Sequence, residues 1–341
     1  MASSIDLFRV PVHEPALSDV RSSALLGPAS GITRFQILKP VAEGYTSAMP
    51  TAHSSFGSES SVDHLRKIVV QALLRAFERH SELGERGLEE IRKNQFGDTA
   101  LRMDIEAEEA VLESLSADRV AVRVISEEHG TVDIGNPEFL AVLDGIDGTA
   151  LYRKEPNHGK YGTMLGLYQG TDPEYADYLI GGIMQHATRK LLIGVRGRGA
   201  FAISENQETQ IHTSRHSGFN TDSKMYIDEY FEMNRKNFSE PLREFNTEYK
   251  EASSLYYAEV AEGSAAFALE CTRKGNLEIA AAYGLIREAG GVTVDGEGSD
   301  IESRKYLVFG QTTNLPIITA ATMGLARELI AFLEASRRSS R

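Results

Sequence analysis

The segment FLAVLDGIDGT, residues 139–149, ends an apolar run with two closely spaced carboxylates. Asp144 closes the run, and Asp147 follows it directly before Gly148 and Thr149. An apolar stretch of this length bounded by Asp and Gly predicts a buried strand followed by a turn. Acids at a strand end are often only turn residues. The pair therefore indicates a functional site only if further carboxylates converge on the same strand end.

Other carboxylates accompany this motif along the chain. The run VAVRVIS, residues 120–126, predicts a strand that leads into Glu127 and Glu128. A helix is predicted to begin with Asp104 as its N-cap. If the two strands are neighbours, these acids and Asp144 meet at one edge of a sheet, where their charges repel strongly unless a cation is bound. All-oxygen ligands of this kind predict Mg²⁺ or Mn²⁺ and fit zinc or copper poorly.

Gly148 and Thr149 add a predicted anion site to this cluster. Glycine lets backbone N–H groups approach an anion, and a helix start presents unpaired donors to phosphate. Carboxylates that hold two metal ions beside such donors are what phosphoryl hydrolysis requires, because one metal generates hydroxide and the other stabilises the leaving oxygen.

Helical and strand patterns occur on both sides of these motifs. Residues 1–60 are rich in Ser, Pro, Gly and Ala without sustained periodicity, which predicts an irregular N-terminal extension, either a passive tail or an arm on a neighbour. Residues 61–213 predict helices followed by strands, and residues 214–341 predict helices with short strands between them. This pattern predicts an α/β fold of the α+β type, with two sheets.

Charge and cysteine content exclude several classes of partner. The formal net charge of −13 argues against nucleic acid polymers and anionic membranes. Cys271 is the single cysteine, so neither an intrachain disulfide nor a cysteine-built metal site is expected. No segment approaches about 18 consecutive apolar residues, and the N-terminus is a poor signal peptide. We therefore expect a cytoplasmic protein.

Four motifs, in this order and spacing, resemble the inositol monophosphatase family of lithium-sensitive, Mg²⁺-dependent phosphatases. They are GDTALRMDIEAEEAV, ISEEHG, LDGIDGTALY and LEIAAAYGLIREAGG. RGRGAF, residues 196–201, resembles a hairpin of that family, and the resemblance covers residues 60–335. It implies a layered αβαβα sandwich of two subdomains, a homodimer, and two or three Mg²⁺ ions, with Mn²⁺ as an alternative.

The resemblance also implies a set of metal ligands. Glu127, Asp144 and the backbone carbonyl of Ile146 would bind a first metal. Asp144, Asp147 and Glu278 would bind a second. Glu127 is also counted among the catalytic residues.

The resemblance implies further roles around the phosphate. Thr149, oriented by Asp104, would help to activate the attacking water, and the N–H groups of Gly148 and Thr149 would hold the phosphate. Glu270 stands near an acid that binds a sugar or cyclitol hydroxyl, although it can equally be an exposed acid at a helix end. A basic loop after Thr149 would bind a second phosphate or sulfate, or would only be solvated. Its residues are Arg153, Lys154, His158 and Lys160.

Three departures from the family pattern affect these predictions. Gly145 replaces the proline of D-P-I-D, which predicts a looser turn. Leu277 and Glu278 stand in place of Trp-Asp, so the second metal ligand is one methylene longer and its site displaced or weaker. Residues 251–254, EASS, replace a small-residue stretch that usually touches phosphate or substrate.

Together these features predict a Mg²⁺-dependent phosphomonoester hydrolase that acts on a small phosphorylated cyclitol or sugar through metal-activated water. A 3′-phosphate nucleotidase of the same superfamily is the alternative if the basic loop at 153–160 binds a second phosphate. A catalytically weak regulatory protein that binds sugar phosphates is another, motivated by Gly145, Leu277 and Glu278.

Overall fold

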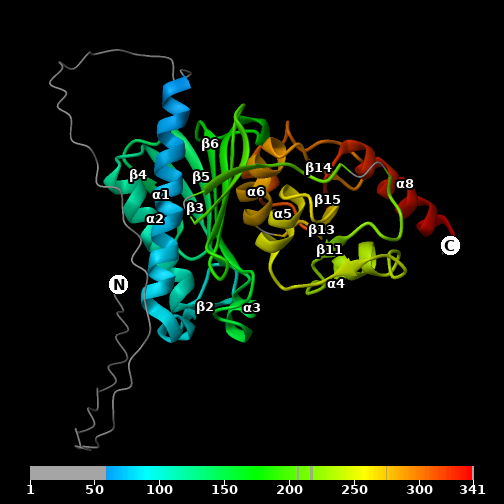
Figure 1. Ribbon diagram of the computed structural model, residues 1–341, viewed down its shortest axis with the longest axis horizontal. Helices are drawn as coiled ribbons and strands as arrows, with labels where there is room; N and C mark the ends of the chain where they lie inside the picture. The colour runs from blue at the N-terminus through cyan, green and yellow to red at the C-terminus, as the bar shows by residue number, and fades with distance from the viewer. Residues whose placement is uncertain (1–58, 206, 216–217, 274, 340–341) are drawn as a thin grey trace, which may run out of the picture. The chain divides into compact units, whose positions relative to one another are not determined.

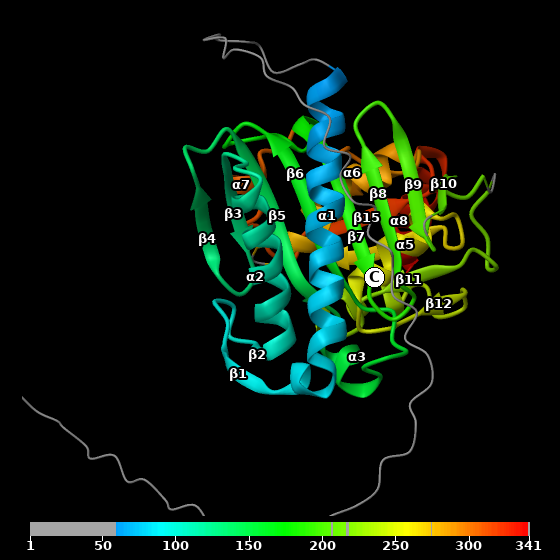
Figure 2. The same cartoon turned by 60° about the vertical axis from the view of Figure 1, so that its left-hand side comes forward.

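Two long helices form one outer layer of the described part of the chain (Figures 1 and 2). The computed structural model describes residues 59–205, 207–215, 218–273 and 275–339, so the predicted extension at 1–60 lies almost entirely outside the described residues. Helix α1 (Glu59–Leu83) packs beside α2 (Arg102–Ala117). Both helices are amphipathic, and their apolar faces are buried against the sheet beneath them. A 3₁₀ turn and a small hairpin connect them: η1 (Gly84–Leu88), β1 (Glu90–Lys93) and β2 (Thr99–Leu101).

The second layer is an eight-stranded sheet with the order β10-β9-β8-β7-β6-β5-β3-β4. Strands β3 and β5 are parallel, and the other neighbours are antiparallel. Every residue of β5 is buried, because helices cover both faces of the sheet at this point. The strands are β3 (Val122–Ser126), β4 (Gly130–Ile134), β5 (Phe139–Asp147), β6 (Gly162–Gln169), β7 (Tyr178–Gln185), β8 (Lys190–Val195), β9 (Gly199–Ser204) and β10 (Gln207–Ile211).

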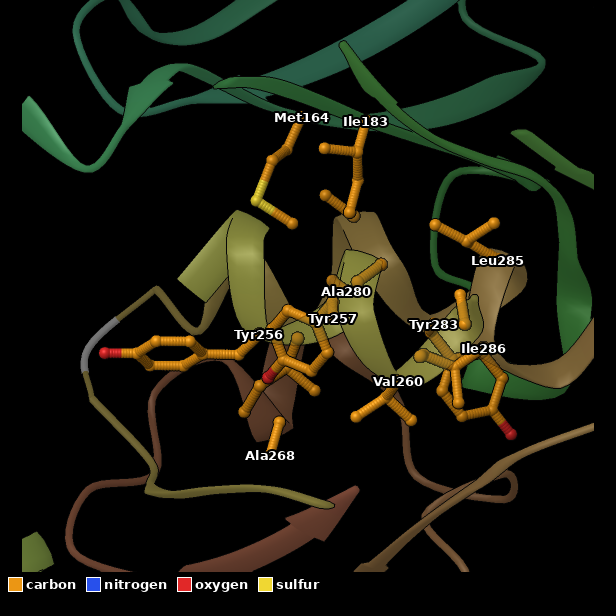
Figure 3. Packing of buried hydrophobic residues seen from close by; sticks show 14 of the residues in the cluster. Met164, Ile183, Tyr256, Tyr257, Val260, Ala268, Ala280, Tyr283, Leu285 and Ile286 are labelled. Atoms are coloured by element: carbon orange, nitrogen blue, oxygen red, sulfur yellow. The ribbon is translucent and has the colours of Figure 1, made fainter. Parts of the chain in front are cut away.

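Helices α5 (Ser253–Ala261) and α6 (Leu277–Glu288) form the middle layer. Figure 3 shows their side chains between Met164 and Ile183 of the large sheet and Ala268 on the opposite side. Helix α6 packs closely against the sheet because the strands have glycine at the points of contact. A Cβ on Gly181 would lie only 2.6 Å from the backbone nitrogen of Leu285.

A five-stranded sheet with the order β12-β11-β13-β15-β14 forms the fourth layer. Its strands are β11 (Met225–Ile227), β12 (Thr247–Glu248), β13 (Phe267–Cys271), β14 (Val292–Asp295) and β15 (Pro316–Ala320). Helix α8 (Met323–Ser339) covers its outer face, on the side away from α5 and α6 (Figure 1). The remaining short elements are α3 (Thr149–Lys154), η2 (Tyr175–Asp177), α4 (Glu232–Asn234), the π-helical turn η3 (Arg235–Ser239) and α7 (Tyr306–Phe309).

This order of layers confirms the predicted α+β class and the αβαβα sandwich. The large sheet ends at Ile211 and the small sheet begins at Met225, so the predicted subdomain boundary at 213 falls between the two sheets. Within the described ranges, no helix combines the length and apolarity needed to cross a membrane. The predicted start of α2 was wrong. The helix begins at Arg102, and Asp104 lies inside its first turn, where its carboxylate accepts a hydrogen bond from the Leu101 N–H at 2.6 Å.

Candidate active site

The ends of two parallel strands bring the predicted acids together. Ser126 of β3 is paired with Leu143 of β5, so both strands end at the same edge of the sheet. The N–H of Glu127 then donates to the Leu143 carbonyl at 3.2 Å, which keeps Glu127 beside Asp144. The conditional prediction that these strands are neighbours is therefore confirmed.

The turn that separates Asp144 from Asp147 is shaped by contacts on both sides. The pairing of β5 with β6 is irregular between these two residues. The Thr163 hydroxyl donates to the Gly145 carbonyl at 2.7 Å. On the other side, α2 approaches so closely that a Cβ on Gly145 would lie 2.2 Å from the Asp104 carbonyl oxygen. Glycine at this position therefore gives α2 room to pack against the turn, which the expectation of a looser turn did not foresee.

Asp144, Asp147 and Glu278 form a compact carboxylate cluster. One oxygen from each lies within 4.8 Å of the other two. Glu278 comes from the first turn of α6, which begins at the preceding residue, Leu277. The extra methylene of glutamate therefore does not keep this side chain away from the two aspartates.

Burial and mutual repulsion dominate the electrostatics of this cluster. Burial, with the charge of Glu278, raises the pKa of Asp147 to about 7. Burial and the charges of Glu127 and Asp147 raise the pKa of Asp144 well above its usual range. The Oδ1 atom of Asp144 is buried and accepts no hydrogen bond from a described residue. An all-oxygen set of this kind fits Mg²⁺ or Mn²⁺, whose charge would offset the repulsion.

Thr149 and Asp104 are brought together as predicted. The Thr149 hydroxyl lies 3.2 Å from Asp104 Oδ1 and 3.0 Å from the Ile146 carbonyl oxygen. Burial raises the pKa of Asp104 to about 8. Gly148 precedes α3 with a φ of 93°, and a Cβ there would lie 2.7 Å from the Cβ of Ala252.

Ile146, Gly148 and Thr149 line one cavity of about 420 Å³. The acidic residues that line it include Glu127, Asp144, Asp147 and Glu278. The walls come from both halves of the chain and include Lys93, Arg153, Asp228, Tyr230, Phe231, Tyr249 and Arg273. A cavity of this size with a few convergent polar groups is typical of a site for a small molecule.

The sequence model of the inositol monophosphatase family matches residues 60–329. The chain belongs to this family. It is also similar to solved structures: the extragenic suppressor protein suhB of Bartonella henselae (TM-score 0.65, 19% identity, 79% of this chain and 98% of that chain) and an inositol monophosphatase of Thermotoga maritima (TM-score 0.63, 18% identity, 81% and 99%). At these identities the structures support the shared fold.

Two curated archaeal proteins are similar in sequence. One is a bifunctional NADP phosphatase/NAD kinase of Methanococcus maripaludis, 25% identical over 64% of this chain. The chain spans only 40% of that protein's length. The other is a fructose-1,6-bisphosphatase/inositol-1-monophosphatase of Thermococcus kodakarensis, 25% identical over 63% of this chain and 76% of its own length.

The structure does not bring all predicted substrate residues to the cavity. Glu270 is buried and does not line the cavity. It accepts a hydrogen bond from the Tyr257 hydroxyl, and burial followed by the charge of Glu278 raises its pKa to about 8. It is therefore not the exposed acid at a helix end that we considered as an alternative.

The basic loop is largely paired with acids. Lys154 forms an ion pair with Glu251 and does not line the cavity. Arg153 lies at the cavity wall and pairs with Glu90 at 2.9 Å. Lys160 pairs with Glu259 at 2.7 Å. His158 is exposed. The loop therefore offers the cavity less free positive charge than its sequence suggests.

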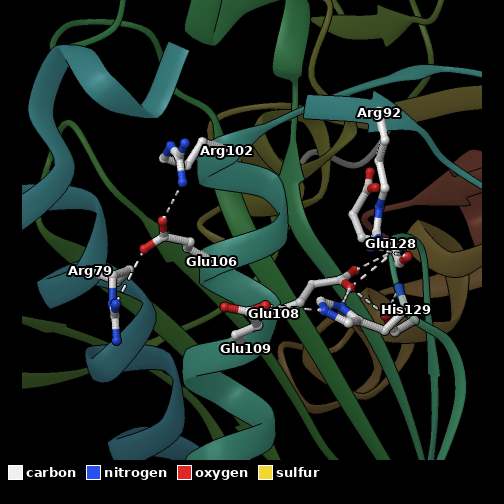
Figure 4. Close-up of polar contacts among 9 residues, drawn as sticks. Arg79, Arg92, Arg102, Glu106, Glu108, Glu109, Glu128 and His129 are labelled. Atoms are coloured by element: carbon white, nitrogen blue, oxygen red, sulfur yellow. Dashed lines mark hydrogen bonds and ion pairs between the residues drawn. The ribbon is translucent and has the colours of Figure 1, made fainter. Parts of the chain in front are cut away.

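A buried hydrogen-bond network fixes the strand end that carries Glu127. Glu108 of α2 is fully buried and accepts hydrogen bonds from the N–H groups of Glu127 at 3.0 Å and Glu128 at 3.1 Å. Figure 4 shows Glu108 between Glu128 and the His129 ring, whose Nδ1 lies 2.8 Å from the carboxylate. The hydrogen bond to Glu108 raises the pKa of His129. Glu108 follows Asp104 by four residues, and this spacing in the sequence indicates that both acids lie on one face of the helix.

Three other residues at the site were missed in the sequence. Asn94, in the β1–β2 hairpin, donates to Glu127 at 3.0 Å. The N–H of Ser254, in the segment that departs from the family pattern, donates to Asp147 Oδ2 at 2.5 Å. Arg273 lines the cavity and forms an ion pair with Glu278. Asn94 and Ser254 lie far from their acids in the sequence, so no local pattern indicated them, whereas Arg273 stands only five residues before Glu278.

Proposed function

We propose that this chain is a Mg²⁺-dependent phosphomonoesterase that acts on a small phosphorylated cyclitol or sugar. The observation that carries the proposal is the cluster of the buried Asp144 and Asp147 with the half-buried Glu278, in a cavity that Gly148 and Thr149 also line. Family membership supports phosphatase chemistry. The cavity volume of about 420 Å³ suits a small metabolite.

The carboxylates present fit the ligand set that the family resemblance implies. Glu127, Asp144 and the Ile146 carbonyl would hold one cation, and Asp144, Asp147 and Glu278 a second. Bound Mg²⁺ would neutralise phosphate charge, lower the pKa of a coordinated water and stabilise the leaving oxygen. The N–H of Ser254 and the amide of Asn94 orient two of these carboxylates, Asp147 and Glu127.

Thr149 and Asp104 would position the nucleophile. The Thr149 hydroxyl donates toward Asp104 Oδ1 or the Ile146 carbonyl, so its lone pairs are left to accept a hydrogen bond from the attacking water. Because Asp104 is fixed by the Leu101 N–H, this orientation is held before substrate arrives. The N–H groups of Gly148 and Thr149 would bind the phosphate.

The substrate, assembly and location belong to the same proposal. The archaeal relatives are named for NADP, fructose 1,6-bisphosphate and inositol 1-phosphate dephosphorylation, which defines the compounds to test first. The pairing of Lys154 with Glu251 and of Lys160 with Glu259 leaves less free positive charge for a second phosphate, which supports a cyclitol or sugar phosphate over a 3′-phosphorylated nucleotide. We propose a homodimer on the family resemblance. We propose a cytoplasmic location because the chain has a single cysteine, Cys271, which is buried and free.

The proposal is tested by measuring phosphate release from a panel of inositol, fructose, histidinol and nucleotide phosphates. We expect turnover of a cyclitol or sugar phosphate with Mg²⁺ and none after chelation by EDTA. Binding of a sugar phosphate without turnover of any compound would contradict the proposal and support the regulatory alternative. Turnover confined to 3′-phosphorylated nucleotides would support the nucleotidase.

A further inference from the structure

Arg273 places a fixed positive charge in the wall of the acidic cavity. Its guanidinium forms an ion pair with Glu278. The guanidinium carbon also lies 4.8 Å from the centre of the Phe231 ring, a cation–π arrangement. Two separate side chains therefore determine where this charge sits, and one of them belongs to the metal-binding cluster.

The backbone of Arg273 is held by contacts outside the cluster. Its N–H donates to the Asn276 side chain at 2.6 Å. Asn276 is buried, and its amide donates to the Phe309 carbonyl at 3.0 Å. Arg273 and Asn276 are therefore anchored to the rest of the protein independently of any cation.

Arg273 stays charged in this environment. A guanidinium is not deprotonated in proteins, and the ion pair with Glu278 holds its charge beside the carboxylates. The permanent charge of the Arg273 guanidinium stabilises the carboxylates when no metal is bound. The same charge repels a divalent cation that binds to these carboxylates.

We propose that Arg273 is a built-in counter-ion of the second metal site, which stabilises the metal-free protein and weakens cation binding to Asp144, Asp147 and Glu278. The inference rests on the proposed function only in so far as these carboxylates bind a divalent cation. It gives this chain a site that is stable when metal is scarce and that fills only at higher Mg²⁺. The residue acts through Glu278 and is not itself a catalytic residue.

The proposal makes two predictions of opposite sign for Arg273→Met. Loss of the charge leaves the carboxylates uncompensated, so the melting temperature in EDTA should fall by about 3 °C or more. The same loss should tighten the weaker Mg²⁺ site about tenfold, because the divalent cation no longer meets a fixed positive charge. A residue with only a structural role would weaken both properties together.

The experiment is calorimetric titration of the full chain with MgCl₂, without substrate, together with thermal melts in EDTA. Arg123→Met is the matched control, since Arg123 pairs with Asp133 at 2.7 Å and neither residue lines the cavity. It should leave the Mg²⁺ isotherm unchanged. Arg273→Lys, which retains the charge, should keep wild-type Mg²⁺ affinity.

Arg273→Gln is a second neutral variant, which keeps the test possible if Arg273→Met does not fold. Glutamine retains a donor for Glu278 without the charge, so it should also tighten Mg²⁺ binding. Unchanged or weaker Mg²⁺ affinity in both neutral variants, with binding present in wild type, would overturn the inference and leave the proposed function intact. Absence of Mg²⁺ binding in wild type and in the neutral variants would overturn both.

Discussion

The backbone carbonyl of Asp104 lies only 2.2 Å from the position that a Cβ on Gly145 would occupy. Asp104, whose side chain meets the Thr149 hydroxyl, therefore also packs its backbone against the turn between Asp144 and Asp147. This contact couples the position of α2 to the geometry of Asp144 and Asp147. Position 145 therefore requires glycine, because the proline that the family carries there would bring a Cβ into contact with α2.

Restoring the family's proline should accordingly damage this protein. Gly145→Pro and Gly145→Ala each add a Cβ that must displace backbone, and we expect a loss of about 1–3 kcal/mol of unfolding free energy and a marked fall in turnover. Gly324→Ala is the control, because a Cβ there meets its nearest neighbour at 3.7 Å. Denaturant unfolding and phosphate release measure both effects. Wild-type stability in Gly145→Pro would show that α2 can move away from the turn.

Neutralising one carboxylate of the cluster should separate activity from stability. Asp144→Asn and Asp147→Asn should each abolish Mg²⁺-dependent turnover, because each removes a charged ligand. Both should raise the melting temperature in EDTA, since the remaining acids repel one another less. Turnover assays at saturating Mg²⁺ and melts in EDTA are the measurements. Near-wild-type turnover in either variant would contradict the metal site.

The metal-free protein should lose stability as the pH rises. Burial raises the pKa of Asp104 to about 8, and that of Glu128 and Asp147 to about 7. Such acids hold protons in the folded state that the unfolded chain releases near pH 4, so their contribution is complete at low pH and is lost as the pH rises through about 7 to 8.

This pH dependence is measured by thermal melts in EDTA from about pH 5 to about pH 8.5. Asp104→Asn should flatten the curve, because one of the titrating groups is removed. Saturating Mg²⁺ should flatten it as well, since bound cations favour the ionised carboxylates. A melting temperature that rises over this range in EDTA would show that ion pairs elsewhere dominate.

Removing the Thr149 hydroxyl should impair the chemical step. Thr149→Ala is expected to lower kcat by about 10²-fold or more with little change in KM, because the lost hydrogen bond orients the nucleophile. Thr149→Ser, which retains the hydroxyl, is the matched control and should keep most of the activity. Steady-state kinetics decide the outcome. A change confined to KM would mean that Thr149 contributes only to phosphate binding.

The sequence determined the elements and the acids they carry. The apolar run before Asp144, the following Gly148-Thr149 and the helix containing Asp104 were all readable, because hydrophobic periodicity and turn residues are local properties. The first turn of α2 was misplaced for a related reason: an acid is favourable both at the N-cap and within the first turn.

Only the tertiary structure decided how charges pair. Lys160 meets Glu259 and Lys154 meets Glu251 across nearly a hundred residues of sequence, so the basic loop is neutralised by partners that no local pattern reveals. Glu270 turns toward Tyr257 while Arg273 turns into the cavity. Arg273 precedes Glu278 by only five residues, but the direction of its side chain depends on its packing against Phe231 and on the hydrogen bond of its N–H to Asn276, which no local pattern reveals.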